Sequence, residues 1–135
     1  MDSRFEVIVA GEVQAPVLKL SAPVSFWGGV DQFTGTIIDR SHPECGADVS
    51  GKVLMVPMIK GSGGTPGSLA TLIKLGKAPA GIVLNHLCPN VMAAALIGQQ
   101  LYGETCPVFL ATAEQSQGLD GAALKICSDG EFTPV

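Results

Sequence analysis

Residues 60–68, with the sequence KGSGGTPGS, are of the types that bind a small anion. They follow an apolar run at 53–57 and precede residues 68–75, whose apolar positions recur at helical spacing. Four glycines let the backbone approach a ligand closely, and a helix N-terminus offers free N–H groups and a partial positive charge. The stretch therefore predicts a site for a carboxylate or phosphate, with Lys60 as a cation. The alternative is a plain turn in which Ser68 caps the helix.

Two common phosphate-binding motifs do not account for this loop. In the Walker A motif the lysine follows the glycines, whereas Lys60 precedes them. A dinucleotide-binding fingerprint would open the first strand–helix unit with G-x-G-x-x-G, and no such spacing stands there.

A second polar segment, residues 27–43, is dense in Gly, Asp, Arg and His. We interpret Asp31 and Asp39 as turn or strand-end residues, while Arg40 and His42 either bind an anion or have a structural role. A metal site needs ligands that converge in space, which spacing alone does not establish here.

Asn85 and His86 follow the apolar run 81–84 and would lie near the edge of the sheet that carries the 60–68 loop. They could line a pocket, with helix capping as the alternative for Asn85. The four cysteines form no CxxC pair and are expected to be small, half-buried apolar residues; they are Cys45, Cys88, Cys106 and Cys127.

Two halves of different pattern position these residues. The second half predicts strand–helix–strand–helix–strand, and parallel strands need such crossovers; the expected elements are 53–57, 68–75, 81–84, 91–102 and 107–110, with a last strand at 122–127. The first half predicts extra strands at 5–10, 15–20 and 35–39, as a second sheet layer or a small barrel. We expect one α/β domain, residues 1–135.

Composition narrows the function. Of 135 residues, 47% are hydrophobic and 15% charged, and the net charge is −4. Such a chain is not disordered, lacks the basic surface of a nucleic-acid binder and has no run long enough to span a membrane. Charges near the N-terminus argue against a signal peptide, so we expect a cytoplasmic protein. Because soluble domains average about 25% charged residues, either the surface is polar without charge or part of it is covered.

Residues 28–43 (GGVDQFTGTIIDRSHP) and 51–57 (GKVLMVP), followed by the 60–68 loop and GKAPA at 76–80, resemble the small subunit of the aconitase X dehydratases. The similarity runs from about residue 7 to residue 110. It implies a swivelling β/β/α domain that pairs with a large catalytic subunit carrying an iron–sulfur cluster or iron, with none bound by this chain. The joint enzyme would dehydrate a small anionic hydroxy acid, which is cis-3-hydroxy-L-proline or phosphomevalonate in this family.

The resemblance also assigns roles within the loop. Ser62 takes the place of the family's catalytic serine and would be the general base. Lys60 replaces the usual arginine, which exchanges a bidentate clamp for a point charge. The residues expected to bind substrate are Lys60, Gly61, Gly63, Gly64, Thr65 and Ser68.

Several alternatives stay open. The low charge content is unlike that of hyperthermophiles, which favours a bacterial source and hydroxyproline over phosphomevalonate. A non-enzymatic module that binds an anionic phosphometabolite would use the same loop. A phosphohistidine carrier would use His42 or His86, although neither lies in a recognisable motif, and a purely structural subunit would need none of these residues.

Overall fold

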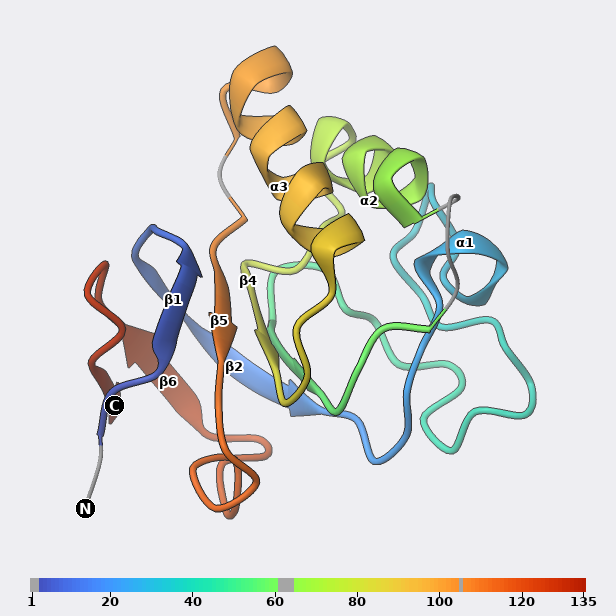
Figure 1. Cartoon of the computed structure of the whole chain (residues 1–135). Helices are drawn as coiled ribbons and strands as arrows, with labels where there is room; N and C mark the ends of the chain where they lie inside the picture. Colours follow the sequence, from blue (N-terminus) through green and yellow to red (C-terminus); the bar gives the residue numbers. More distant parts are fainter. Residues whose placement is uncertain (1–2, 61–64, 105) are drawn as a thin grey trace.

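Three short, buried, parallel strands form the centre of the molecule (Figure 1). The structure is a computed structural model and describes residues 3–60, 65–104 and 106–135. The three strands are β3 (Val53–Val56), β4 (Gly81–Leu84) and β5 (Val108–Leu110). Val53 pairs with Gly81, and Ile82 pairs with Val108. Helices α2 (Thr65–Lys74) and α3 (Pro89–Tyr102) connect the strands and cover one face of the sheet (Figure 1). The predicted strand–helix–strand–helix–strand order is confirmed.

The helix ends follow from local chemistry, with one correction. Helix α3 begins at Pro89, which suits a first turn, and ends at Tyr102. Gly103 caps it with a left-handed backbone, and its N–H donates to the carbonyl of Gln99. Helix α2 begins at Thr65, so the prediction that Ser68 caps it is wrong. Ser68 lies inside the helix, since α2 already includes position 66, where a first turn tolerates a proline.

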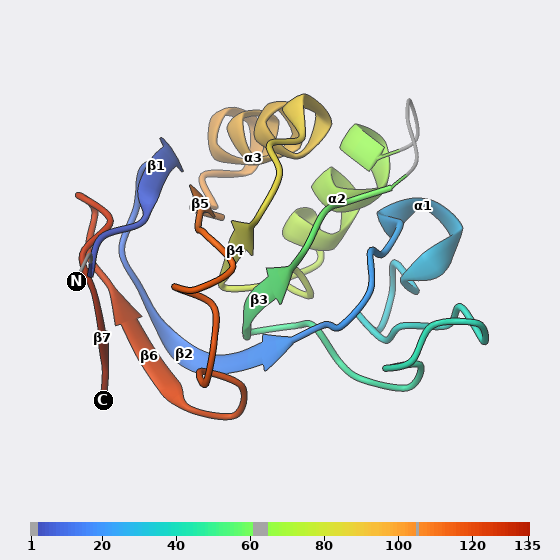
Figure 2. The ribbon, with the colours of Figure 1, turned by 60° about the horizontal axis from the view of Figure 1, so that its bottom comes forward.

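Strand β2 (Val13–Lys19) belongs to two parts of one sheet. Val17 pairs in parallel with Val53 of β3, while Val13 pairs antiparallel with Ile126 of β6 (Ala123–Ile126). The strand order is β1-β5-β4-β3-β2-β6-β7, with β1 at Glu6–Val9 and β7 at Phe132–Pro134. Figure 2 shows how β2 sweeps from the parallel centre to β6. The extra strands therefore extend the same curled sheet instead of forming a separate layer.

The two edges of this sheet meet at a contact that we call the seam, formed by residues 3–5 and 130–132. The N–H of Phe5 donates to the carbonyl of Gly130 at 2.8 Å, and the N–H of Phe132 donates to the carbonyl of Ser3 at 2.9 Å. The rings of Phe5 and Phe132 stack with their centroids 3.9 Å apart. The seam makes the sheet barrel-like, the second of the two arrangements expected for the extra strands.

Alternating side chains of the central strands fill two cores. Leu54 and Ile82 face α2 and α3, whereas Met55, Val83 and Phe109 point into the curl of the sheet. Both faces of these strands are buried, which explains their unbroken apolar sequence.

The segment between β2 and β3 departs from the prediction. The strand expected at 35–39 is wrong: Ile37 and Thr36 make isolated bridges to Val30 and Asp48, and no ladder forms. Ile37 is nevertheless fully buried, so its β-branched side chain serves the core. The short helical turn α1 (Phe26–Gly29) stands before it, beside the start of α2 (Figure 1).

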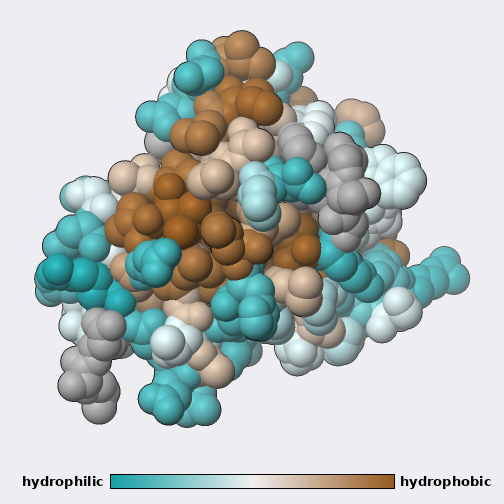
Figure 3. Space-filling model, in the orientation of Figure 1, coloured by the Kyte–Doolittle hydropathy of each residue, from teal (hydrophilic) through white to brown (hydrophobic). Residues whose placement is uncertain are grey.

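Apolar side chains also gather on the surface. Figure 3 shows such a region over β1, β5 and part of α3. Exposed Leu87 and Leu96 belong to this part of the chain, together with the half-buried Ile8, Met92 and Leu110. The low charge content of the sequence thus corresponds in part to exposed apolar surface.

Candidate functional site

The start of α2 follows the carboxyl end of β3, the edge where open α/β sheets place ligands. Residues 61–64, which include Ser62 and three of the predicted glycines, lie outside the described residues, as do the side chains of Thr65 and the following proline. The described part of the site consists of the chain up to Lys60 and the first turns of α2.

On the near side, the main chain before the loop is fixed to the segment that precedes α1. Ile59 forms a parallel bridge with Val24, and the N–H of Lys60 donates to the carbonyl of Val24 at 2.9 Å. The Lys60 side chain is exposed. A cation therefore faces the solvent at this edge of the sheet.

On the far side, Ser68 is held by a residue that the sequence did not single out. Ser68 is only 3% exposed, and its Oγ accepts a hydrogen bond from Nε2 of Gln32 at 3.1 Å. Gln32 belongs to the polar segment 27–43, so the two motifs that carried the family resemblance meet at the first turns of α2. Sequence spacing could not predict this contact, because the two residues are 36 positions apart. The sequence signal for it was the joint presence of both motifs.

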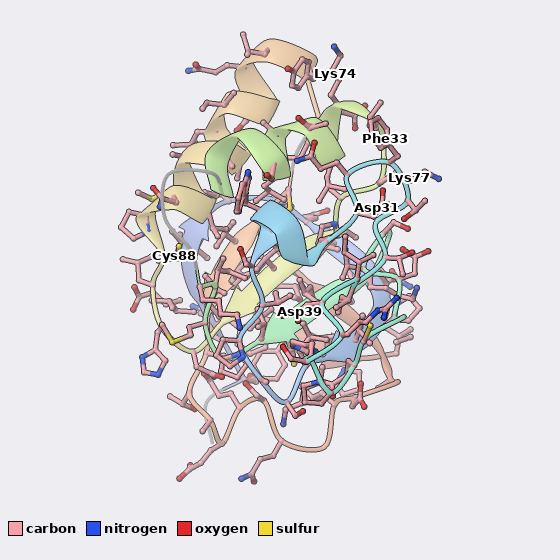
Figure 4. All side chains as sticks on the ribbon, turned by 90° about the vertical axis from the view of Figure 1, so that its right-hand side faces the viewer. Asp31, Phe33, Asp39, Lys74, Lys77 and Cys88 are labelled. Carbon is pink, nitrogen blue, oxygen red and sulfur yellow. The ribbon has the colours of Figure 1, made fainter. Side chains whose placement is uncertain are left out.

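The acidic residues of the 27–43 segment shape turns, as interpreted from the sequence. Asp31 Oδ1 accepts the N–H groups of Phe33 at 2.8 Å and Thr34 at 3.2 Å. Asp39 Oδ1 accepts the hydroxyl of Ser41 at 2.7 Å and its N–H at 3.0 Å. The two aspartates lie on separate turns (Figure 4).

The pKa of Asp39 is lowered. The largest cause is the hydrogen bond from the Ser41 hydroxyl, and the nearby positive charge of Lys60 adds to it. Lys60 therefore already has one carboxylate in its surroundings.

His42 has a structural role. It is buried, its Nδ1 accepts the N–H of Glu44 at 3.0 Å, and its Nε2 lies 3.0 Å from the carbonyl of Ala22. Because a backbone N–H can only donate and a carbonyl can only accept, the ring is the neutral tautomer with its proton on Nε2. Both ring nitrogens have backbone partners, which argues against His42 as the phosphorylated residue of a phosphohistidine carrier.

The remaining candidates are dispersed. Arg40 and His86 are exposed. Asn85 donates from Nδ2 to the carbonyl of Ala111 at 3.0 Å and to Oγ of Ser116 at 3.3 Å, and the residue that precedes α3 as its cap is Cys88. The capping alternative for Asn85 is therefore wrong, and the side chain instead joins the chain after β4 to the chain after β5.

A small cavity lies at the ends of β2, β3 and β4. Its volume is about 30 Å³, enough for one or two water molecules. It is lined by Lys19, Leu20, Met55, Val56, Pro57, Asn85 and Ser116.

The cysteines are free thiols. Cys88 and Cys127 are half-buried and Cys106 is buried, while Cys45 is exposed, which the sequence did not predict. Burial raises the pKa of the Cys106 thiol to about 12. Within residues 3–60, 65–104 and 106–135, no three His, Cys, Asp or Glu side chains are grouped so as to hold a metal ion. In the same part of the chain, no helix has the length and apolarity to cross a membrane.

Together these features define an α/β domain whose curled, seam-closed sheet has the start of α2 at one edge. Comparison with known sequences gives the family: a profile of the aconitase X swivel domain matches residues 2–131. The chain belongs to the aconitase X swivel domain family.

Named relatives fall into two groups. The chain is 35% identical over 101 residues to cis-3-hydroxy-L-proline dehydratase of Pseudomonas aeruginosa, which covers 75% of this chain but 17% of that protein. It is 39% identical over 99 residues to the phosphomevalonate dehydratase small subunit of Methanothermobacter thermautotrophicus, covering 72% of this chain and 74% of that one. The chain thus spans about a sixth of the first relative's length and about three quarters of the second's.

A solved structure has the same fold. The crystal structure of Thermococcus kodakaraensis aconitase X in its holo form matches with a TM-score of 0.86 and 26% identity, covering 98% of this chain and 96% of that chain. The swivelling-domain fold that the sequence resemblance implied is confirmed.

Proposed function

We propose that this chain is the small subunit of a cytoplasmic aconitase X-type hydro-lyase, in which residues 1–135 form a single swivelling domain. It would remove water from a small anionic hydroxy acid together with a large catalytic subunit. The family membership supports this proposal, as do relatives named as dehydratases. The observation that carries the site is the start of α2, which borders the glycine-rich loop next to the exposed Lys60.

Dehydration of a β-hydroxy acid needs a base for the proton next to the carboxylate. We assign this role to Ser62. A serine hydroxyl is a weak base unless negative charge is favoured at its oxygen, and a helix N-terminus, glycine N–H groups and a lysine all favour it. The residues proposed to hold the substrate carboxylate are Lys60, Gly61, Gly63, Gly64, Thr65 and Ser68.

We assign the iron–sulfur cluster or iron that the family implies to the large subunit. The described side chains of this chain do not fit a metal ion, because no three suitable ligands converge in residues 3–60, 65–104 and 106–135. No step of the reaction is therefore derived from a metal held by this chain.

The first candidate substrate is cis-3-hydroxy-L-proline, supported by the match to the Pseudomonas aeruginosa dehydratase and by the low content of charged residues, 15%. Phosphomevalonate is the second candidate. It is favoured by the higher identity, 39%, to a small subunit of which the chain covers 74%.

The test is to co-express the chain with the large subunit and to measure loss of water from both substrates. Ser62→Ala should reduce turnover at least about a thousandfold, a loss typical of removing a group that acts in the chemical step, while the complex still assembles. Ser128→Ala, at an exposed turn before the seam, is the matched control and should keep full turnover. Near-normal turnover of Ser62→Ala would instead support a purely structural subunit.

The isolated chain should be inactive, because half of the proposed site belongs to the partner. Titration of the isolated chain with both anions separates the remaining alternative. Tight binding of phosphomevalonate without the large subunit would favour the non-enzymatic binding module.

A further inference from the structure

Both borders of the glycine-rich loop are fixed to the same short segment, residues 24–32. Before the loop, Lys60 donates its N–H to the carbonyl of Val24 at 2.9 Å. After the loop, Gln32 donates from Nε2 to Oγ of Ser68 at 3.1 Å. Figure 1 shows this segment, which includes α1, beside the start of α2. One piece of chain thus determines how far apart the two borders lie.

The segment itself is firmly held. Phe26 and Val30 are buried in the core beneath the helices, and the carbonyl of Gly29 accepts the N–H of Ile38 at 2.9 Å. Immediately before Gln32, the carboxylate of Asp31 fixes the next turn through two backbone N–H groups. The amide of Gln32 is therefore presented from a rigid base.

Ser68 is the natural point of attachment. Ser68 is almost completely buried, and buried hydroxyl groups in proteins require a hydrogen-bond partner. Gln32 supplies that partner from outside the helix. Any displacement of the first turns of α2 has to break this bond.

We propose that Gln32 is a positioning residue for the reaction: through Ser68 it fixes the start of α2, which borders the loop that contains the proposed base Ser62. The proposal rests on the function proposed above. Gln32 needs no contact with substrate, because its effect passes through Ser68.

Kinetics of the co-expressed complex test this role. Gln32→Ala should lower kcat about tenfold or more, because small misplacements of a reacting group are costly. It should lower the melting temperature by only about 3–5 °C, because it leaves one buried hydroxyl group without this partner. Gln32→Glu should keep most of kcat, since the Ser68 hydroxyl can donate to a carboxylate in the same place, and should raise KM through repulsion of an anionic substrate. Gln14→Ala, at an exposed position of β2, is the matched control and should leave both constants unchanged.

A double-mutant comparison isolates the contact. Gln32→Ala and Ser68→Ala should each lower kcat, and the combined variant should lose no more than the stronger single variant, because the two residues act through one bond. Fully additive losses would overturn the proposal, as would a Gln32→Ala complex with the parental kcat.

A measurement that needs no activity separates this inference from the proposed function. In the chain alone, Gln32→Ala should speed amide hydrogen exchange at positions 69–72, the first N–H groups of α2 that have carbonyl partners within the helix, by about tenfold or more. This increase should exceed any change in β3 to β5, because local opening and global stability are distinct. If the parent complex dehydrates neither hydroxy acid, the proposed function fails. Unchanged exchange at the start of α2 would overturn the role of Gln32 in either case.

Discussion

The seam and the loop edge of the sheet are built in opposite ways. At the seam, main-chain hydrogen bonds and the stacked rings of Phe5 and Phe132 leave little unsatisfied. At the loop edge, the flanking segments leave large apolar side chains in solvent: Trp27 is 66% exposed and Phe33, at the rim in Figure 4, is 75% exposed. The seam is complete within one chain, whereas the loop edge has the exposed aromatic groups that protein interfaces favour.

This difference separates stability from function along the sheet. Changes at the seam should cost folding free energy and leave turnover per folded complex intact. Changes at the loop edge should cost turnover and leave folding nearly untouched. Exposed aromatic groups beside the loop also fit the proposed docking of a large subunit at this edge.

The largest expected effect concerns Cys106, which lies in the packed core of the domain. Because burial raises the pKa of Cys106 to about 12, its thiolate at pH 8 should be roughly a thousandfold scarcer than that of an ordinary thiol. Mass spectrometry after reaction with a thiol reagent should show prompt modification of the exposed Cys45 and protection of Cys106. Modification of Cys106 at the rate of Cys45 in the native protein would contradict a tightly packed core. In denaturant both thiols should react, which is the control.

Next in size is a substitution at the seam. Gly130 has a φ of +92°, and a Cβ at this position would overlap the carbonyl oxygen of Phe5. Gly130→Ala should lower the free energy of unfolding by about 2–4 kcal/mol, from backbone strain and overlap combined. Denaturant titration measures the loss.

The control for this substitution shares the backbone conformation without the contact. Gly118 has a φ of +73° and open space around the same Cβ position. Gly118→Ala should cost only about 1 kcal/mol, the lower end of the cost of the strained backbone alone. Equal losses at the two positions would show that the seam contact itself contributes nothing.

A smaller effect is expected at the loop edge. Lys60→Ala should lower kcat/KM by about tenfold, the lower end for a hydrogen bond to a charged group because the side chain is exposed. Lys60→Arg should keep most activity, and Lys125→Ala, on the exposed side of β6, should have no effect. Steady-state kinetics and a melting curve decide together: a Lys60→Ala complex that loses stability but not activity would reverse the comparison.

The smallest effect is a pH dependence at Asp39. Its lowered pKa means that the ionised form stabilises the fold above the unfolded value of about 3.9, and that this contribution disappears as the pH falls through the lower folded value. The melting temperature of Asp39→Asn should lie about a degree or less below that of the parent at pH 7, with the difference vanishing near pH 2. Glu12→Gln is the exposed control, and a difference that grows towards low pH would contradict the assignment.

Much of the central fold was predictable because its causes are local. Continuous apolar runs marked β3 and β4, and a proline and a glycine marked the ends of α3. The seam was not predictable, because it joins residues near opposite ends of the sequence and β7 is only three residues long, Phe132–Pro134. The 35–39 run misled because burial of Ile37, not strand pairing, accounts for its β-branched residues.

The candidate site divides in the same way. Residue types alone predicted an anion-binding loop with Lys60 as its cation, and this stays a prediction. They could not distinguish an anion-binding His42 from a structural one, because its role depends on two backbone partners, the carbonyl of Ala22 and the N–H of Glu44. The contact between Gln32 and Ser68 likewise exists only in the folded chain.

The seam has a mechanical consequence as well. Because Ser3 and Phe132 are hydrogen-bonded neighbours, the N-terminal end of the domain and the start of β7 share one corner, at the lower left of Figure 1, and the C-terminus lies one short strand away from it. The start of α2 is at the upper right. A domain tethered at that corner to a larger body rotates about it whichever end carries the connection. The loop edge then sits at the far end of the lever, where a small rotation produces the greatest travel.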